Sequence, residues 1–487
     1  MLEQKLNDPS LLKQAGFING QWVNAKDGKT FEVFNPAVGE VIANVADLGT
    51  KETLQAIEAA QVAFDDWKVV PAKQRSSLLR RWFELVLDHQ EDLAVIMTFE
   101  QGKVIAESRG EIAYGASYIE WFAEEAKRIY GDVLPSTSAD RRSLVIKQPV
   151  GVVGAITPWN FPNAMITRKV APALAAGCTI VLKPAAETPL SALALAELGR
   201  RAGIPAGVFN VVVGTDAKAI GAELTSSSIV KKITFTGSTA VGKLLMEQSA
   251  KTVKKTSMEL GGNAPVLIFE DADLDKAVEG ALVAKFRNAG QTCICANRIL
   301  VQDSIYEEFI SRFTARVSEF VLGDGVSSTS TMGPLISRKA VAGVTSLVDD
   351  AVSQGAKICI GGSASNNGDH FFQPTVLRDL NTSMRLAKEE VFGPVAPVFM
   401  FSSEKEAVDM ANDTEFGLAA YMYTKDHSRI WRVGEALEYG MVGINETAIS
   451  SEMIPFGGVK ESGQGREGSK YGLEDYLEVK YFCLGDI

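Results

Sequence analysis

Two patterns of apolar and polar positions alternate along the middle of this chain. Short apolar runs are separated by segments in which apolar residues recur every three or four positions. The runs lie at residues 150–156, 178–182, 208–213 and 232–235, and the helical segments lie at 164–175, 190–202 and 217–226. Strands that alternate with helices in this way predict βαβ units in a parallel sheet. Such sheets bind ligands at the carboxyl ends of their strands, here residues 157–161, 183–187, 214 and 236–238.

The flanking segments have different patterns. Residues 16–45 alternate short apolar runs with turns, which favours short antiparallel strands. Residues 51–131 have a mostly helical pattern and are interpreted as scaffold, with a helix end and a polar turn at 99–103. Residues 135–147 join a polar stretch to an alternating strand, which predicts an arm that pairs outside the main sheet.

A carboxylate and a cysteine lie on either side of a predicted helix. Glu259 precedes a double glycine, Cys293 follows a glycine-containing turn, and residues 271–286 have a helical pattern with Asp273 as N-cap. A helix there allows the chain to fold back so that Glu259 and Cys293 face one cavity. The pair would combine a thiolate nucleophile with a carboxylate that can take a proton from water.

Composition and charge narrow the class of protein. A chain of 487 residues is too long for one core, and 46% hydrophobic with 22% charged residues is typical of a soluble globular protein. The net charge of −11 argues against a nucleic-acid partner, and it means that an anionic substrate needs local arginines. No run reaches the length of a membrane span, and five scattered cysteines and three histidines favour neither a disulfide scaffold nor a histidine-rich metal site. We therefore expect a cytoplasmic protein without a metal or a membrane partner.

Two nucleotide-binding motifs match only in part. Residues 463–468 satisfy G-x-G-x-x-G but follow a loop rather than a strand. Residues 237–244 follow a strand and approach a P-loop, but Leu244 replaces the hydroxyl residue that would bind magnesium. A P-loop phosphohydrolase is therefore one rival hypothesis, and a non-catalytic binding protein is another. The glycine turn and helix start at 237–242 still suit a dinucleotide phosphate, because free N–H groups favour an anion there.

Seven short motifs occur in one order along the chain. They are TPWNFP at 157–162, KPA at 183–185, FTGS at 235–238, ELGG at 259–262, GQTC at 290–293, EEVFGP at 389–394 and PFGG at 455–458. Together they resemble the aldehyde dehydrogenase superfamily over essentially the whole chain. Within it, residues 165–169, 285–295 and 465–472 are most similar to the bacterial succinate-semialdehyde dehydrogenases.

The resemblance implies an α/β fold in three parts. A Rossmann-type parallel-sheet domain for the cofactor would comprise residues 1–134 and 150–258, and an α/β catalytic domain would comprise 259–470. A small β oligomerisation arm would join 135–149 to 471–487. Because sheet completion between subunits would satisfy open strand edges, a homo-dimer or homo-tetramer is expected.

The resemblance also implies roles for three catalytic residues. Cys293 would attack an aldehyde and form a thiohemiacetal, and the Asn160 side chain would bind the oxyanion together with the Cys293 backbone N–H. Hydride transfer would leave a thioester, and Glu259 would activate water to hydrolyse it. The alternatives are that Cys293 is a buried inert cysteine, that Asn160 is a turn residue and that Glu259 is a surface carboxylate.

The cofactor implied is NADP, with NAD as the alternative. Its contacts would be Trp159, Asn160, Lys183, Pro184, Ala185, Ala186, Gly237, Ser238, Leu260, Glu390 and Phe392. Relatives that prefer NAD often carry a glutamate where this chain has Ala186. The missing carboxylate and the nearby Lys183 favour a 2′-phosphate, whereas Glu187, one position later, favours NAD.

The implied substrate is succinic semialdehyde, oxidised to succinate. Arg168, Arg287 and Ser450 would bind its distal carboxylate, and a guanidinium suits that role because it binds a carboxylate bidentately. The alternative is that both arginines form structural ion pairs. Glutarate semialdehyde is the rival substrate, since one methylene changes binding by only about 1–3 kcal/mol.

Cys295 lies two residues after the proposed nucleophile. The resemblance suggests a redox switch in which a disulfide between Cys295 and Cys293 blocks the site. The alternative is that Cys295 is only a small residue that packs in the core.

Overall fold

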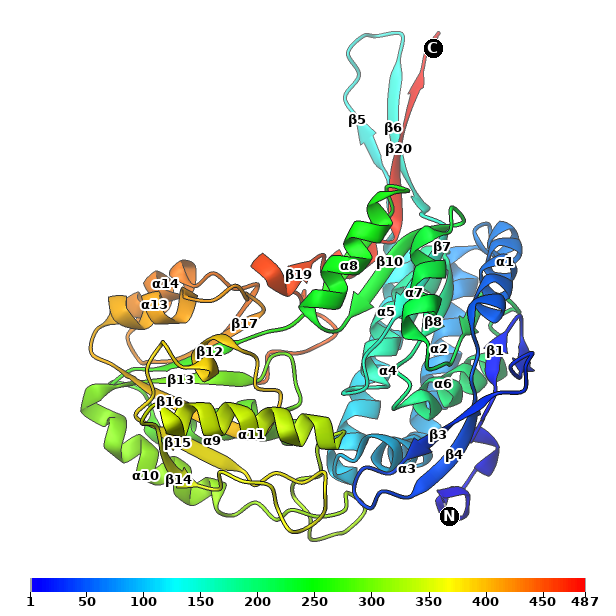
Figure 1. Cartoon of the computed structure of the whole chain (residues 1–487). Coiled ribbons are helices and arrows are strands. Elements are labelled where there is room, and N and C mark those ends of the chain that lie inside the picture. Colours follow the sequence, from blue (N-terminus) through cyan, green and yellow to red (C-terminus); the bar gives the residue numbers. More distant parts are fainter. Residues whose placement is uncertain (1, 487) are drawn as a thin grey trace.

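The computed structural model describes residues 2–486, which form two sheets side by side and a projecting arm (Figure 1). The first sheet has the strand order β19-β11-β10-β7-β8-β9-β1-β2. Its central strands are parallel, as predicted. They are β7 (Val152–Ile156), β8 (Thr179–Lys183), β9 (Phe209–Val211), β10 (Val230–Thr236) and β11 (Lys255–Glu259), with β1 (Gly16–Ile18), β2 (Gln21–Val23) and β19 (Gly463–Gln464) at the edges.

Helices cover this sheet and form the predicted scaffold beside it. The crossover helices are α5 (Ala164–Ala176), α6 (Pro189–Ala202), α7 (Ala217–Ser226) and α8 (Thr239–Ala250). The N-terminal helices are α1 (Thr50–Trp67), α2 (Ala72–Asp88), α3 (Gln90–Gln101) and α4 (Ile105–Glu125). Helix α4 packs along α5, which brings the N-terminal region against the loop that precedes α5. A separate hairpin consists of β3 (Thr30–Phe34) and β4 (Val41–Ala46), and both predicted N-terminal strand pairs are antiparallel.

The second sheet has the order β14-β15-β16-β13-β12-β17-β18. Its strands are β12 (Ala264–Ile268), β13 (Ala296–Gln302), β14 (Lys357–Ile360), β15 (Thr375–Arg378), β16 (Val395–Phe401), β17 (Ala419–Tyr423) and β18 (Met441–Ile444). Its helices are α9 (Leu274–Phe286), α10 (Tyr306–Val317), α11 (Arg338–Ser353), α12 (Arg385–Lys388), α13 (Glu404–Asn412) and α14 (His427–Ala436). Near the chain end, α15 (Tyr471–Glu474) packs against α5 beside the first sheet. The predicted helix between Glu259 and Cys293 is α9, and the Asp273 side chain caps it by accepting the Lys276 N–H.

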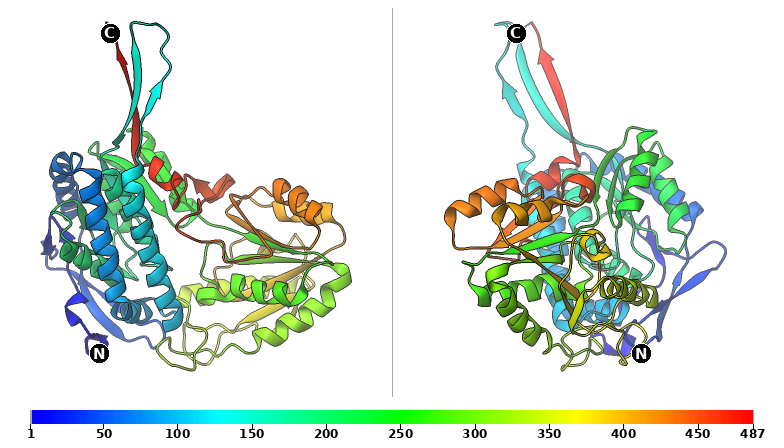
Figure 2. Two further views of the ribbon diagram at one scale, coloured as in Figure 1. Left: turned by 180° about the vertical axis from the view of Figure 1, so that it is seen from behind. Right: turned by 60° about the vertical axis from the view of Figure 1, so that its left-hand side comes forward.

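The arm is a three-stranded antiparallel sheet that projects from the body (Figures 1 and 2). It consists of β5 (Asp132–Leu134), β6 (Arg142–Pro149) and β20 (Leu477–Leu484), in the order β20-β6-β5. Apolar side chains on it are exposed, including Val133 at 79% and Val479 at 68%. The strand predicted after residue 135 therefore does pair outside the main sheets.

The chain passes from the first sheet to the second between Glu259 and Ala264. Strand β19 lies in the segment that we assigned to the catalytic domain, yet it pairs with β11 at the edge of the first sheet. The domain boundaries themselves stay a prediction.

The polar cluster at 99–103 is a helix end, but its side chains are not a solvated turn. Helix α3 ends at Gln101, and Gly102 takes a left-handed conformation with φ of 94°. Glu100 and Lys103 are both buried. Glu100 accepts the backbone N–H groups of Leu190 and Ser191 at the start of α6, which satisfies free donors of that helix.

Within residues 2–486, no helix is both long and apolar enough to cross a bilayer. The same residues contain no cluster of three or more histidine, cysteine or acidic side chains suited to a metal ion.

Candidate active site

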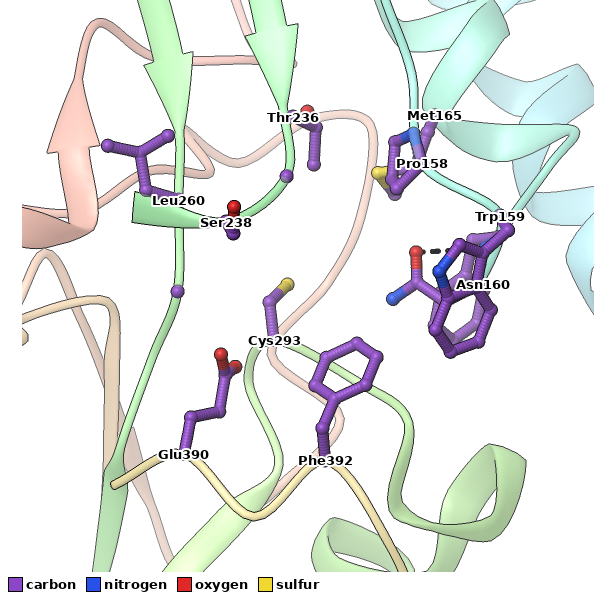
Figure 3. A pocket seen from close by; sticks show the side chains of 13 residues that line it. Pro158, Trp159, Asn160, Met165, Thr236, Ser238, Leu260, Cys293, Glu390 and Phe392 are labelled. Carbon is purple, nitrogen blue, oxygen red and sulfur yellow. Dashed lines mark hydrogen bonds between the residues drawn. The ribbon is translucent and has the colours of Figure 1, made fainter. Parts of the chain in front are cut away.

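A cavity of about 230 Å³ lies where the two sheets meet (Figure 3). It lies at the carboxyl ends of β7 and β10, the edge at which a parallel sheet is expected to bind ligands. Eight residues singled out from the sequence line it: Trp159, Asn160, Gly237, Ser238, Leu260, Cys293, Glu390 and Phe392.

The Cys293 thiol is half-buried and faces this cavity. Before it the chain makes a tight left-handed turn, with φ of 52° at Asn288, 54° at Ala289 and 77° at Gly290. A Cβ on Gly290 would lie 2.1 Å from the Gly393 carbonyl oxygen, so only glycine fits there. Burial raises the pKa of the Cys293 thiol to about 12, although the positive charge of Arg168 acts to lower it. The thiol must therefore lose a proton before it can act as a nucleophile.

Asn160 lies in the loop between β7 and α5, and its side chain is fixed at both ends. Its Nδ2 donates to the Gln291 carbonyl at 3.1 Å, and its Oδ1 accepts the Phe161 N–H at 3.2 Å. A primary amide has two N–H groups, so one remains free. The amide nitrogen is on the side of the cavity that holds Cys293 (Figure 3).

Glu259 ends β11 and is 3% exposed. It is not among the residues that line the cavity, and within the described chain neither of its carboxylate oxygens has a hydrogen-bond partner. Burial and the nearby charge of Glu467 raise the pKa of Glu259 well above its usual value, although Arg168 and Lys169 oppose the shift. Glu259 therefore holds a proton over a wider pH range than an ordinary glutamate.

Glu467 is the centre of a buried charge cluster beside Glu259. Lys169 pairs with one of its oxygens and also donates to Thr236 Oγ1 at 2.7 Å. The Nε of Arg168 lies 2.9 Å from the other oxygen. Glu467 was not singled out from the sequence, because its partner Lys169 is 298 residues away and no local pattern marks the pair.

The end of the cavity near α8 is suited to an anion. Gly237 and Ser238 precede α8, and Ser238 is its N-cap residue with an exposed side chain. The first N–H groups of a helix have no partner within that helix, so they can bind a phosphate. The Gly237 N–H itself donates to the Glu259 carbonyl at 3.0 Å and fixes the turn.

Glu390 and Phe392 form another side of the cavity. Glu390 Oε1 accepts the Gly262 N–H at 3.2 Å. Burial raises the pKa of Glu390 to about 7, while that N–H and Lys285 oppose the shift. The ring of Phe392 meets Trp159 edge-to-face with 5.5 Å between centroids. An acceptor, an aromatic pair and a helix N-terminus together fit a dinucleotide.

Residues 183–186 lie at the same sheet edge but outside the lining of the cavity. Lys183 ends β8 beside β7, and its Nζ donates to the Pro184 carbonyl at 3.0 Å. Burial lowers the pKa of Lys183, while Glu187 and Asp47 oppose the shift. Ala185 and Ala186 are half-buried and Glu187 is exposed.

Arg168, Arg287 and Ser450 are not among the residues that line this cavity. Arg168 is 1% exposed, and its guanidinium lies 4.0 Å from the ring centre of Phe456. Its contact with Glu467 is made by Nε, and its Nη2 has no hydrogen-bond partner among the described residues. Arg287 lies over the Phe161 ring at 4.9 Å, and Ser450 is half-buried in the loop after β18.

Cys295 is buried and does not line the cavity. Its thiol donates to the Lys285 carbonyl at 3.0 Å, and all five cysteines of the described chain are free. A disulfide with Cys293 would require Cys295 to leave that contact.

Five lining residues were not singled out from the sequence: Pro158, Phe161, Met165, Thr236 and Gly261. All lie inside motifs or stretches that carried the family resemblance, so their position was the available signal. The rejected motif at 463–468 includes β19, which pairs with β11, and none of its residues lines the cavity.

The structure thus brings a cysteine thiol, an asparagine amide and a helix N-terminus together in one cavity at the meeting point of two α/β sheets. The Aldehyde dehydrogenase family profile matches residues 22–482, and the chain belongs to this family.

Relatives of known name match almost the whole chain. The succinate-semialdehyde dehydrogenase GabD of Escherichia coli, whose name specifies NADP(+), is 59% identical over 99% of this chain and 100% of its own. A glutarate-semialdehyde dehydrogenase of Pseudomonas putida is also 59% identical, over 99% of each chain. The crystal structure of succinate-semialdehyde dehydrogenase from Burkholderia pseudomallei superposes with a TM-score of 0.98 at 57% identity, covering 99% of both chains.

Proposed function

We propose that this protein oxidises succinic semialdehyde to succinate with NADP, and that NAD serves as the second coenzyme. The observation that carries the proposal is the placement of Cys293 and the free amide N–H of Asn160 in one cavity with the N-terminus of α8. The E. coli relative, 59% identical, is named for this reaction and coenzyme.

The first step would form a carbon–sulfur bond. The Cys293 thiol first loses its proton to water, and the thiolate then adds to the aldehyde carbon while the carbonyl oxygen becomes an oxyanion. The free N–H of the Asn160 side chain and the backbone N–H of Cys293 donate to that oxygen, and such donors preorganised in a dry cavity favour the transition state.

The cavity would also position the coenzyme. A bound nicotinamide dinucleotide supplies the hydride acceptor, with phosphate at the turn of Gly237 and Ser238 and its nicotinamide side near Glu390 and Phe392. Lys183 and the small side chain of Ala186 support NADP, because no carboxylate at position 186 repels a 2′-phosphate.

The last step would release the acid. Oxidation leaves a thioester on Cys293, and Glu259 takes a proton from the water that attacks it. The C–S bond then breaks and the thiolate of Cys293 is regenerated. Because burial raises the pKa of Glu259, this step should accelerate with pH.

Arg168 and Arg287 support an anionic substrate. The net charge of −11 disfavours anions over the whole molecule, so recognition must be local. Nη2 of Arg168 is buried without a partner in the described chain, and a distal carboxylate would satisfy it. Ser450 would add a hydroxyl donor. Glutarate semialdehyde is the second candidate, supported by the P. putida relative.

The proposal includes a cytoplasmic homo-oligomer, a dimer or a tetramer. Free cysteines suit a reducing compartment. Exposed apolar side chains on the arm suit contact between subunits.

Reduced-coenzyme absorbance tests the proposal directly. Wild-type protein is mixed with succinic or glutarate semialdehyde and NADP or NAD, and Cys293→Ala is the control. We expect the highest kcat/KM with succinic semialdehyde and NADP, and no turnover by Cys293→Ala. Turnover that survives in Cys293→Ala, or none by the wild type with either aldehyde, would refute the proposal.

A further inference from the structure

A buried lysine outside the cavity joins helix α4 to the loop that carries Asn160. Lys103 is 2% exposed and lies just after α3. Its Nζ donates to Glu111 Oε2 at 2.6 Å and to the Asn160 carbonyl at 2.8 Å. It also lies 4.0 Å from the centre of the Phe161 ring. An ammonium has three N–H groups, and these three neighbours account for them.

Glu111 extends the contact to the other end of the same loop. Its Oε1 accepts the N–H groups of Asn163 and Ala164 at 2.9 and 3.2 Å, where α5 begins. One ion pair therefore holds the loop between β7 and α5 at Asn160 and at the start of the helix. The stabilisation expected from a buried ion pair is small relative to apolar packing, so stability alone does not account for it.

A second contact joins this loop to the turn before Cys293. Asn288 Nδ2 donates to the Asn160 carbonyl at 3.0 Å and to the Gln291 carbonyl at 3.3 Å. The Asn288 N–H donates to Glu107 Oε1 at 2.8 Å. Glu107 and Glu111 are one turn apart on α4, so a single helix holds both loops through two carboxylates.

We propose that Lys103 is a positioning residue: paired with Glu111, it holds the Asn160–Phe161 peptide so that the free amide N–H of Asn160 points at the substrate oxygen. Among the described residues, Lys103 is not one of those that line the cavity, so it acts through Asn160 rather than on the substrate. The inference rests on the proposed function, in which that amide binds the oxyanion.

Amide hydrogen exchange tests the geometry without relying on the reaction. Lys103→Met removes all three donors at similar length, and Lys232→Met is the matched control because Lys232 is equally buried but donates to Ser257. We expect faster exchange across residues 157–164 in Lys103→Met and unchanged exchange there in Lys232→Met. Unchanged exchange in Lys103→Met would overturn the inference. If Lys103→Met does not fold, Glu111→Gln, which keeps its shape, should show the same change.

A double-mutant cycle then tests the route through Asn160. Oxyanion donors contribute about 10²–10³-fold to kcat, so Asn160→Ala should lose about that much and Lys103→Met about 10–100-fold. The KM for NADP should stay unchanged in Lys103→Met, because Lys103 does not line the cavity. If Lys103 acts through Asn160, the double variant should be within about threefold of Asn160→Ala, whereas independent effects multiply and would overturn the inference.

Different results would refute the proposed function and the positioning role of Lys103. A wild-type protein that oxidises neither semialdehyde refutes the proposed function, whatever the exchange experiment shows. A wild type that is active, with Lys103→Met equally active, refutes the positioning role of Lys103 alone.

Discussion

Replacing Arg168 by methionine should remove the preference for an acidic aldehyde. Methionine keeps an apolar side chain against Phe456 while removing the guanidinium, whose Nη2 has no partner in the described chain. Arg168 also lies beside Glu467, 2.9 Å from its Oε2, so the substitution changes the charge near Glu259 as well. The prediction must therefore separate substrate binding from that second effect.

The size of the effect follows from the bond that would be lost. A hydrogen bond to a charged group contributes about 1.5–3 kcal/mol. Since about 1.4 kcal/mol is a factor of ten, kcat/KM for succinic semialdehyde should fall about 10- to 150-fold. Butanal has a methyl group in place of the carboxylate and makes no such bond. The second effect, through Glu467 and Glu259, acts on both aldehydes and cancels in the ratio of their kcat/KM values.

The assay is the kcat/KM ratio of succinic semialdehyde to butanal at saturating NADP. We expect the ratio to fall at least tenfold in Arg168→Met, in line with one lost charged hydrogen bond. Glu467→Gln is the control, because it removes the neighbouring charge and leaves the guanidinium in place; its ratio should change less than about threefold. An unchanged ratio in Arg168→Met, or an equal fall in Glu467→Gln, would show that Arg168 is a structural ion-pair partner.

Three further predictions concern the coenzyme, the last chemical step and the second cysteine. Glu259→Gln should release one burst of reduced coenzyme and then stall. Wild-type kcat should rise with pH, because burial and Glu467 raise the pKa of Glu259, and a pH-independent kcat would contradict this. Ala186→Glu should lower the NADP-to-NAD ratio of kcat/KM at least about tenfold through repulsion of the 2′-phosphate, measured by coenzyme titration. Wild-type activity lost to peroxide should return with a dithiol, and less should return in Cys295→Ser if Cys293 is blocked by a disulfide; equal recovery would remove the redox switch.

Local patterns predicted the elements that depend on local interactions. The helix over 271–286 and its cap at Asp273 follow from periodicity and side-chain chemistry, and the structure has α9 at Leu274–Phe286. The alternation of strands and helices over 150–235 likewise predicted that the central strands of the first sheet are parallel. The family motifs named eight residues that line the cavity, whereas Glu259, Arg168 and Arg287, named from the same resemblance, do not line it.

Contacts between distant segments could not be predicted in this way. The cluster at 99–103 has the composition of a solvated turn, yet Lys103 is buried because its charge meets Glu111 and the Asn160 carbonyl 57 residues away. Arg168 and Glu467 are paired although more than half of the chain separates them in sequence. A polar residue has the same local appearance whether water or a distant partner satisfies it, so only the folded chain distinguishes the two cases.

The position of β19 has a consequence for how the chain folds during synthesis. Strand β11 is complete by residue 259, but its outer neighbour comes from residues 463–464, and β6 of the arm pairs with β20, which ends at residue 484. The ribosome therefore exposes the first sheet with an open edge for the time needed to make about two hundred more residues, at about 5–20 residues per second. Open edges are where chains pair with the wrong partner. Completion of the coenzyme-side sheet and of the arm must wait until the last part of the chain is made.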